Sequence, residues 1–158
     1  MAKTVNSEAS VATAFRELAL GEAFTFDELV SAVQSRRRRG IRIVELAELS
    51  DHDGLCAIWL MTDTEDIVLH ARSDSRLHRQ QFVLHELAHM ILGHGIDDDR
   101  EMPDFLLPDI PLDTRRRLLR RQNLDTAEEV IAESLADQLA AAIRGSAMHE
   151  SRFLEIFG

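Results

Sequence analysis

The sequence contains no tyrosine, one cysteine and only three prolines in 158 residues. A single cysteine, Cys56, excludes an intramolecular disulfide, and its apolar neighbours favour a small buried side chain. No apolar run approaches the roughly 20 residues that span a bilayer, and residues 1–10 lack the apolar core of a secretory signal. We therefore expect a cytoplasmic protein with no membrane partner.

Basic residues are fewer than acidic ones, 18 against 28, which gives a formal net charge of -10. Such a field repels nucleic acids and anionic membranes, so we expect no direct nucleic-acid partner. The two basic clusters, at residues 36–39 and 115–121, are interpreted as solvated helix ends or faces. Apolar residues make up 45% of the chain, which is enough for one buried core.

Apolar periodicity and capping signals divide the chain into helices and strands. Thr25 and Glu28 have the spacing of a capping box at the start of one helical pattern. Helices are expected over residues 9–19, 26–39, 76–92, 114–122 and 127–144. Strands rich in β-branched residues are expected over residues 41–46, 55–61 and 66–71. The short link between the last two strands predicts a hairpin.

These elements predict an α+β fold, because the strands occur together and do not alternate with helices. We expect a single domain over residues 1–158, with N-terminal helices in residues 1–40 and the sheet and metal-site helices in residues 41–145. The sheet is expected to be small, three-stranded and mostly antiparallel, packed against the helix over residues 76–92. The strand at residues 66–71 is the candidate edge for binding an extended peptide by strand addition.

Residues 81–94 read QFVLHELAHMILGH and contain the main chemical motif of the chain. His85 and His89 are four residues apart, so on a helix they share one face and can bind one cation. Glu86 lies about 100° around the helix from His85, beside the ligand face. Two histidines, a third protein ligand and an open position for water form a zinc hydrolase site, with the glutamate as general base.

The third ligand is expected from a later helix, where Glu128, Glu129 and Glu133 are candidates. We favour Glu133, because the small residues around it allow two helices to approach closely. Glu128 and Glu129 lie near the start of the expected helix, where the helix dipole alone favours acidic residues. Asp137, one turn after Glu133, is expected to accept a hydrogen bond from a ligand histidine and so fix its orientation.

Peptide hydrolysis also needs a donor that stabilises an oxyanion, and this chain has no tyrosine to supply it. An arginine or one of three histidines near the motif, His70, His78 or His94, would have to serve. His78 shares a helix face with His85 if the helix begins early enough. His94 is one residue short of the position of a third ligand histidine in related motifs, so it is expected to cap or line the site, with direct ligation as the alternative.

The two motifs together resemble the ImmA/IrrE family, bacterial zinc-dependent peptidase-like proteins often encoded beside a helix-turn-helix repressor. The family pattern is HExxH, often followed by a Gly-His pair, and then a helix of the form E-x-x-A-(N/D)-x-(F/L)-A. The resemblance covers about residues 40–145. The matching positions are His85, Glu86, His89, Gly93, His94, Glu133, Ala136, Asp137, Leu139 and Ala140.

The resemblance implies a zincin-like fold of the gluzincin type, with one Zn²⁺ bound by His85, His89 and Glu133 and with Glu86 as general base. It also implies cleavage of a specific regulatory protein, a helix-turn-helix repressor encoded nearby, and so the derepression of stress-response or mobile-element genes. The alternative is a non-catalytic zinc-fold module, or a toxin-like partner, that sequesters a regulator without cutting it.

Overall fold

The computed structural model describes residues 2–46, 57–62, 64–94 and 126–157. Within these ranges it contains four helices and one three-stranded sheet, which confirms the predicted α+β class. The helices are α1 (Ala2–Glu17), α2 (Phe26–Arg37), α3 (Arg76–Leu92) and α5 (Thr126–Phe157). The strands are β1 (Gly40–Glu45), β2 (Ala57–Met61) and β3 (Glu65–His70). The predictions for Cys56, for the helix over residues 114–122 and for the basic cluster at 115–121 lie outside the described residues.

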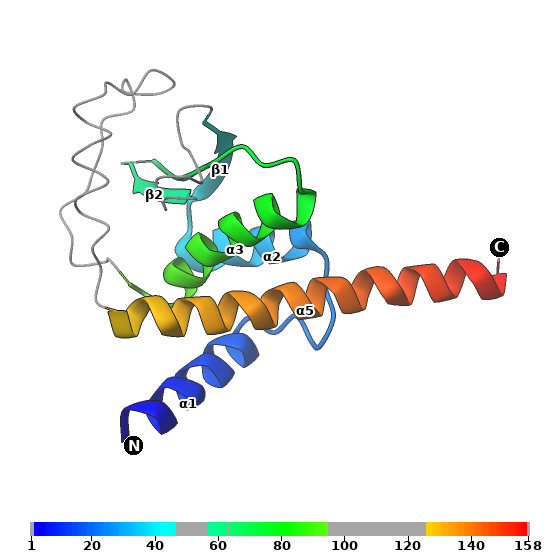
Figure 1. Ribbon diagram of the computed structural model, residues 1–158, viewed down its shortest axis with the longest axis horizontal. Helices are drawn as coiled ribbons and strands as arrows, with labels where there is room; N and C mark the ends of the chain where they lie inside the picture. The colour runs from blue at the N-terminus through cyan, green and yellow to red at the C-terminus, as the bar shows by residue number, and fades with distance from the viewer. Residues whose placement is uncertain (1, 47–56, 63, 95–125, 158) are drawn as a thin grey trace.

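Helix α3 lies between the sheet and the long helix α5 (Figure 1). It contacts β2 and β3 on one side and α5 on the other, while α1 packs against α5 and α2 packs against α3 and β1. The largest core side chains of the helical layer, each at most 1% exposed, are Phe24, Leu29, Val33, Leu84, Leu87, Leu135 and Leu139. Because α3 is held on two sides, the polar residues on its remaining surface have fixed positions.

The predicted capping signal is present at the start of α2, and a second one begins α3. Thr25 Oγ1 accepts a hydrogen bond from the backbone N–H of Glu28 at 3.1 Å, as the capping-box spacing predicts. Ser75 Oγ accepts one from the backbone N–H of His78 at 3.3 Å, and α3 begins at the next residue. The first helix is longer than predicted, because it begins at Ala2.

The sheet is mixed, so the prediction of a mostly antiparallel sheet was wrong. The strand order is β1-β3-β2, in which β3 pairs with β2 in antiparallel orientation and with β1 in parallel orientation. The hairpin prediction is confirmed, and Thr62 Oγ1 accepts the backbone N–H of Glu65 at 3.0 Å in its turn. Strand β3 carries three successive side chains, Ile67, Val68 and Leu69, with at most 1% exposure. A strand buried on both faces is stable in the middle of a sheet, with a neighbour on each side.

The central position of β3 also corrects the prediction that residues 66–71 form a peptide-binding edge. Val68 in this strand pairs with Ile43 of β1 on one side and with Trp59 of β2 on the other. Within the described residues, the edges of the sheet belong to β1 and β2. Strand addition would therefore have to use one of those two strands.

A buried carboxylate joins α2 to the sheet. Asp66 of β3 is fully buried and accepts hydrogen bonds from Arg37 at 2.5 and 3.2 Å and from Trp59 Nε1 at 3.1 Å. Arg39 Nε lies 3.6 Å from the same carboxylate, and the Arg37 guanidinium lies over the Trp59 ring. The interpretation of residues 36–39 as a solvated helix end is therefore wrong for these two arginines, which are counter-charges for one buried acid.

We expect the Asp66→Asn variant to be strongly destabilised, because it leaves two partly buried guanidinium groups without their counter-charge. The free energy of unfolding should fall by about 3–5 kcal/mol, as when one partner of a buried ion pair is lost. The neighbouring variant Glu65→Gln is the control, because Glu65 pairs with the half-exposed Arg42 and its loss should cost less than about 1 kcal/mol. Urea unfolding followed by circular dichroism measures both, and equal losses would contradict the expectation.

Candidate metal centre

The HExxH motif lies on α3, as predicted, and its apolar neighbours fix the orientation of the helix. The buried apolar residues of α3 are Val83, Leu84, Leu87, Ala88 and Met90. His85 and His89 share one face, as their four-residue spacing requires. His89 is 2% exposed and the His85 side chain is 26% exposed, so the pair lies at the boundary between the core and solvent.

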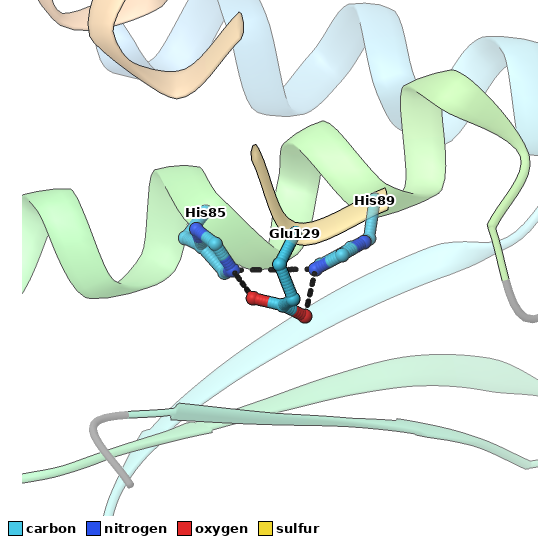
Figure 2. A group of neighbouring side chains, drawn as sticks. All are labelled: His85, His89 and Glu129. Atoms are coloured by element: carbon cyan, nitrogen blue, oxygen red, sulfur yellow. Dashed lines mark hydrogen bonds and ion pairs between the residues drawn. The ribbon is translucent and has the colours of Figure 1, made fainter. Parts of the chain in front are cut away.

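Three side chains converge at this face, namely His85, His89 and Glu129 of α5 (Figure 2). The Nε2 atoms of the two histidines are 3.2 Å apart. Glu129 Oε2 lies 2.9 Å from His85 Nε2, and its Oε1 lies 3.1 Å from His89 Nε2. These ligand atoms all lie within 4.8 Å of one another, so the group could hold a metal ion.

The chemistry of the group fits a divalent cation. Two imidazole nitrogens and a carboxylate that face one another bring lone pairs together, which is unfavourable unless a proton or a cation lies among them. Tetrahedral zinc, with ligand bonds of about 2.0–2.1 Å, holds its ligand atoms about 3.3 Å apart. The nitrogen–nitrogen separation of 3.2 Å is close to that spacing. The prediction of a metal-binding group is therefore supported, although the distances by themselves do not select zinc.

Packing between α5 and α3 positions Glu129. The buried stripe of α5 consists of four residues that are each 0% exposed, Ala132, Leu135, Ala136 and Leu139. Two contacts show that the helices run antiparallel. Gln81 of α3 bonds to Asp137 of α5, and His89, about two turns later in α3, contacts Glu129, about two turns earlier in α5. The small side chains of the stripe allow α5 to lie close to α3, and its first turn then carries Glu129 to the histidines.

The structure places Glu129, and not the predicted Glu133, beside the histidines. Glu133, four residues further along α5, is exposed, whereas Glu129 is partly buried against the histidines. Glu129 was one of the three candidate glutamates, but its position near the start of the helix is also favoured by the helix dipole alone. The alanine–leucine stripe does not distinguish the two glutamates, because Glu129 and Glu133 each lie three residues before a buried alanine, Ala132 and Ala136 respectively.

Three other predicted site residues are not brought into this group. Asp137 is exposed and accepts a hydrogen bond from Gln81 Nε2 at 3.1 Å, so it does not orient a ligand histidine as predicted. His78 lies at the start of α3, with its ring tilted against Phe82. His70 is buried at the end of β3, and its Nδ1 lies 3.1 Å from the carbonyl oxygen of the next residue.

His94 and Glu86 do lie at the site. His94 Nδ1 is 2.9 Å from His89 Nδ1, and burial lowers the pKa of His94. Burial, and then the charge of Glu129, raises the pKa of Glu86 to about 8. Burial, and then the charge of His85, lowers the pKa of His89 to about 4. Without a metal, Glu86 and His89 are therefore mostly uncharged near neutral pH, as desolvation requires.

Two further findings concern the class of protein. Within the described ranges, no helix combines the length and apolarity needed to cross a membrane. Comparisons with models of protein families, with curated proteins and with solved structures find no match to this chain. The possible function is therefore inferred from the residues of the site and from the motifs in the sequence.

We expect Glu129→Gln to lose bound zinc and Glu133→Gln to retain it. Both substitutions remove one charge from the same helix at nearly constant volume, but only Glu129 contacts the histidines. Wild-type protein purified without a tag or a chelator should contain about one zinc per chain, as a mononuclear site requires. Plasma mass spectrometry after dialysis measures the content. Loss of zinc in Glu133→Gln with retention in Glu129→Gln would show that the geometric assignment is wrong.

The stability of the metal-free protein should fall between about pH 6.5 and 8. In this range Glu86 has lost its proton in the unfolded state but keeps it in the folded state, so folding takes up a proton and weakens as pH rises. Below pH 6.5 this effect is opposed by His89, which is protonated when unfolded but not when folded. The decline is about 1.4 kcal/mol per pH unit.

Urea unfolding in the presence of a chelator, at several pH values in this window, measures the decline. Glu86→Gln cannot lose a proton, so its stability should stay nearly constant over the same range. An equal decline in the wild type and in this variant would show that another group is responsible.

Proposed function

We propose that this chain is a zinc-dependent metallopeptidase of the ImmA/IrrE type, with one Zn²⁺ bound by His85, His89 and Glu129. The observation that carries the proposal is the convergence of two imidazoles and one carboxylate, with the buried Glu86 directly after the first histidine. This ligand set is the one that many zinc hydrolases use. When bound, zinc supplies Lewis acidity, which polarises a carbonyl group and lowers the pKa of water.

Glu86 is the proposed general base. The residue is 6% exposed, and its pKa of about 8 without a cation keeps it protonated at neutral pH. Positive charge among the neighbouring ligands would lower this pKa toward neutrality. A carboxylate with such a pKa can take a proton from water and return it to the leaving amine. Its position next to His85 in sequence puts it beside the ligand face and not within the ligand set.

The proposed substrate is a protein, namely a helix-turn-helix repressor encoded beside this chain. This part of the proposal comes from the resemblance of HELAHMILGH and the later ESLADQLA to the family motifs. Of the two strands at the sheet edges, β2 contacts α3, which carries the histidines. An extended segment of the repressor would therefore add to the sheet along β2, beside the metal helix.

One observation favours a second candidate function, in which the protein binds its regulator without cutting it. The chain has no tyrosine, and of the three candidate histidines only His94 lies at the site, where its Nδ1 contacts His89 and not the ligand group. A site without an oxyanion donor loses a large part of the stabilisation that hydrolysis needs. Such a protein would keep its zinc fold and act by sequestration.

Replacement of Glu86 by Gln distinguishes the two functions. If the chain is a peptidase, kcat/KM for cleavage of the repressor should fall by about 10²–10⁴-fold, the usual contribution of a general base. Zinc content should not change, and Glu133→Gln should cleave normally as the matched control. Gel electrophoresis and mass spectrometry of the repressor identify the products. Repressor that stays intact with wild-type protein, together with derepression in cells by Glu86→Gln, would contradict the peptidase and favour sequestration.

A further inference from the structure

The end of α3 points a second imidazole at the metal-site histidine His89. The helix ends at Leu92, and Gly93 follows with a φ of 76°, in the left-handed region that favours glycine. After this residue the chain turns back, and the backbone N–H of His94 donates to the carbonyl oxygen of His89 at 2.9 Å. The same turn places His94 Nδ1 at 2.9 Å from His89 Nδ1. His94 therefore contacts His89 through both its backbone and its side chain.

The ring contact determines where the protons lie. At this distance one of the two Nδ1 atoms donates a hydrogen bond and the other accepts it. His89 Nε2, on the opposite side of the ring, lies 3.2 Å from His85 Nε2 and 3.1 Å from a Glu129 oxygen. A neutral histidine that binds a metal through Nε2 carries its proton on Nδ1. His89 is then the donor, and His94 accepts at Nδ1 and carries its own proton on Nε2.

We propose that His94 is a positioning residue that fixes the tautomer and ring orientation of His89 for metal binding through Nε2. The inference rests on the proposed function, because it presupposes that His89 is a metal ligand. A carboxylate or a backbone carbonyl commonly accepts this second hydrogen bond of a ligand histidine, and here an imidazole takes that place. Direct ligation by His94 does not fit the geometry, because it contacts the ring nitrogen of His89 that faces away from the ligand group.

Gly93 is part of the same arrangement. Its left-handed backbone conformation is strained for any residue with a Cβ. The hydrogen bond from the Gly93 N–H to the Met90 carbonyl, at 3.2 Å, closes the last turn of the helix. The Gly-His pair that follows HExxH is thus one unit, in which the glycine turns the chain and the histidine supplies the acceptor.

The zinc affinity of two variants of the full chain tests the proposal. His94→Leu removes the acceptor at similar volume, whereas His94→Asn keeps an acceptor oxygen near the position of Nδ1. Competition with a chromophoric zinc chelator should show about 10–100-fold weaker binding for His94→Leu, the usual cost of losing such a partner. His94→Asn should recover most of this affinity. His78→Leu is the control, because it replaces a histidine of α3 that lies outside the ligand group. It should bind zinc like the wild type.

A spectroscopic readout tests the tautomer directly and does not depend on whether a variant folds. Long-range ¹H–¹⁵N spectra of the zinc-loaded wild type should show His89 protonated on Nδ1 and His94 protonated on Nε2 only. Three results would overturn the inference: a proton on His94 Nδ1, wild-type affinity in His94→Leu, or equally weak binding by His94→Leu and His94→Asn when both are folded.

The failure of this inference can be told apart from failure of the proposed function. If His85→Ala loses zinc while His94→Leu binds it normally, the metal site stands and the positioning role is wrong. If the folded wild type cannot be loaded with zinc, both are wrong.

Discussion

The site depends on close packing between α3 and α5. The axes of two packed helices lie about 8–10 Å apart, according to the size of the side chains between them. The contact stripe of α5 contains Ala132 and Ala136, both fully buried, which favours the short end of that range. A glutamate side chain is short, so Glu129 reaches the two histidines only if its backbone lies this close. A larger residue at position 132 would therefore separate the helices and withdraw the carboxylate from the histidines, even though it touches neither.

The charges of two buried acidic residues, Asp66 and Glu86, are compensated in different ways. Asp66 is fully buried, and the chain itself provides the compensating charge through Arg37 and Arg39. At the candidate metal centre, no lysine or arginine in the described part of the chain forms an ion pair with Glu86 or Glu129. The ion-pair partners of Glu129 are the two histidines. Burial neutralises Glu86 there instead, by raising its pKa. A site of this kind gains stability from an added cation, so metal binding and folding are expected to be coupled.

The parts of the fold that could be predicted are those set by local sequence. The four-residue spacing of His85 and His89 defines a helix face wherever the helix lies, and the Thr25 cap acts within a single turn. The β2–β3 hairpin is local for the same reason. The direction of β1 and the central place of β3 are different, because they depend on how segments distant in sequence pack, which no local pattern encodes. The ion pairs of Arg37 and Arg39 with buried Asp66 were not predicted for the same reason, since Asp66 is 27–29 residues away in sequence.

The choice between Glu129 and Glu133 also depends on packing between distant segments. The stripe of α5 repeats every four residues, as Ala132, Ala136 and Ala140 and as Leu135 and Leu139. Sliding α5 by four residues, about 6 Å, would put Ala136 in the place of Ala132 and Leu139 in the place of Leu135, and would bring Glu133 to the place of Glu129. Apolar patterning therefore cannot choose between the two glutamates. In the structure the choice is made by specific contacts, including the bond from Gln81 to Asp137, which set the register of α5 against α3. Which glutamate lies beside the histidines therefore follows from the register of this helix pair, and a measurement that establishes one establishes the other.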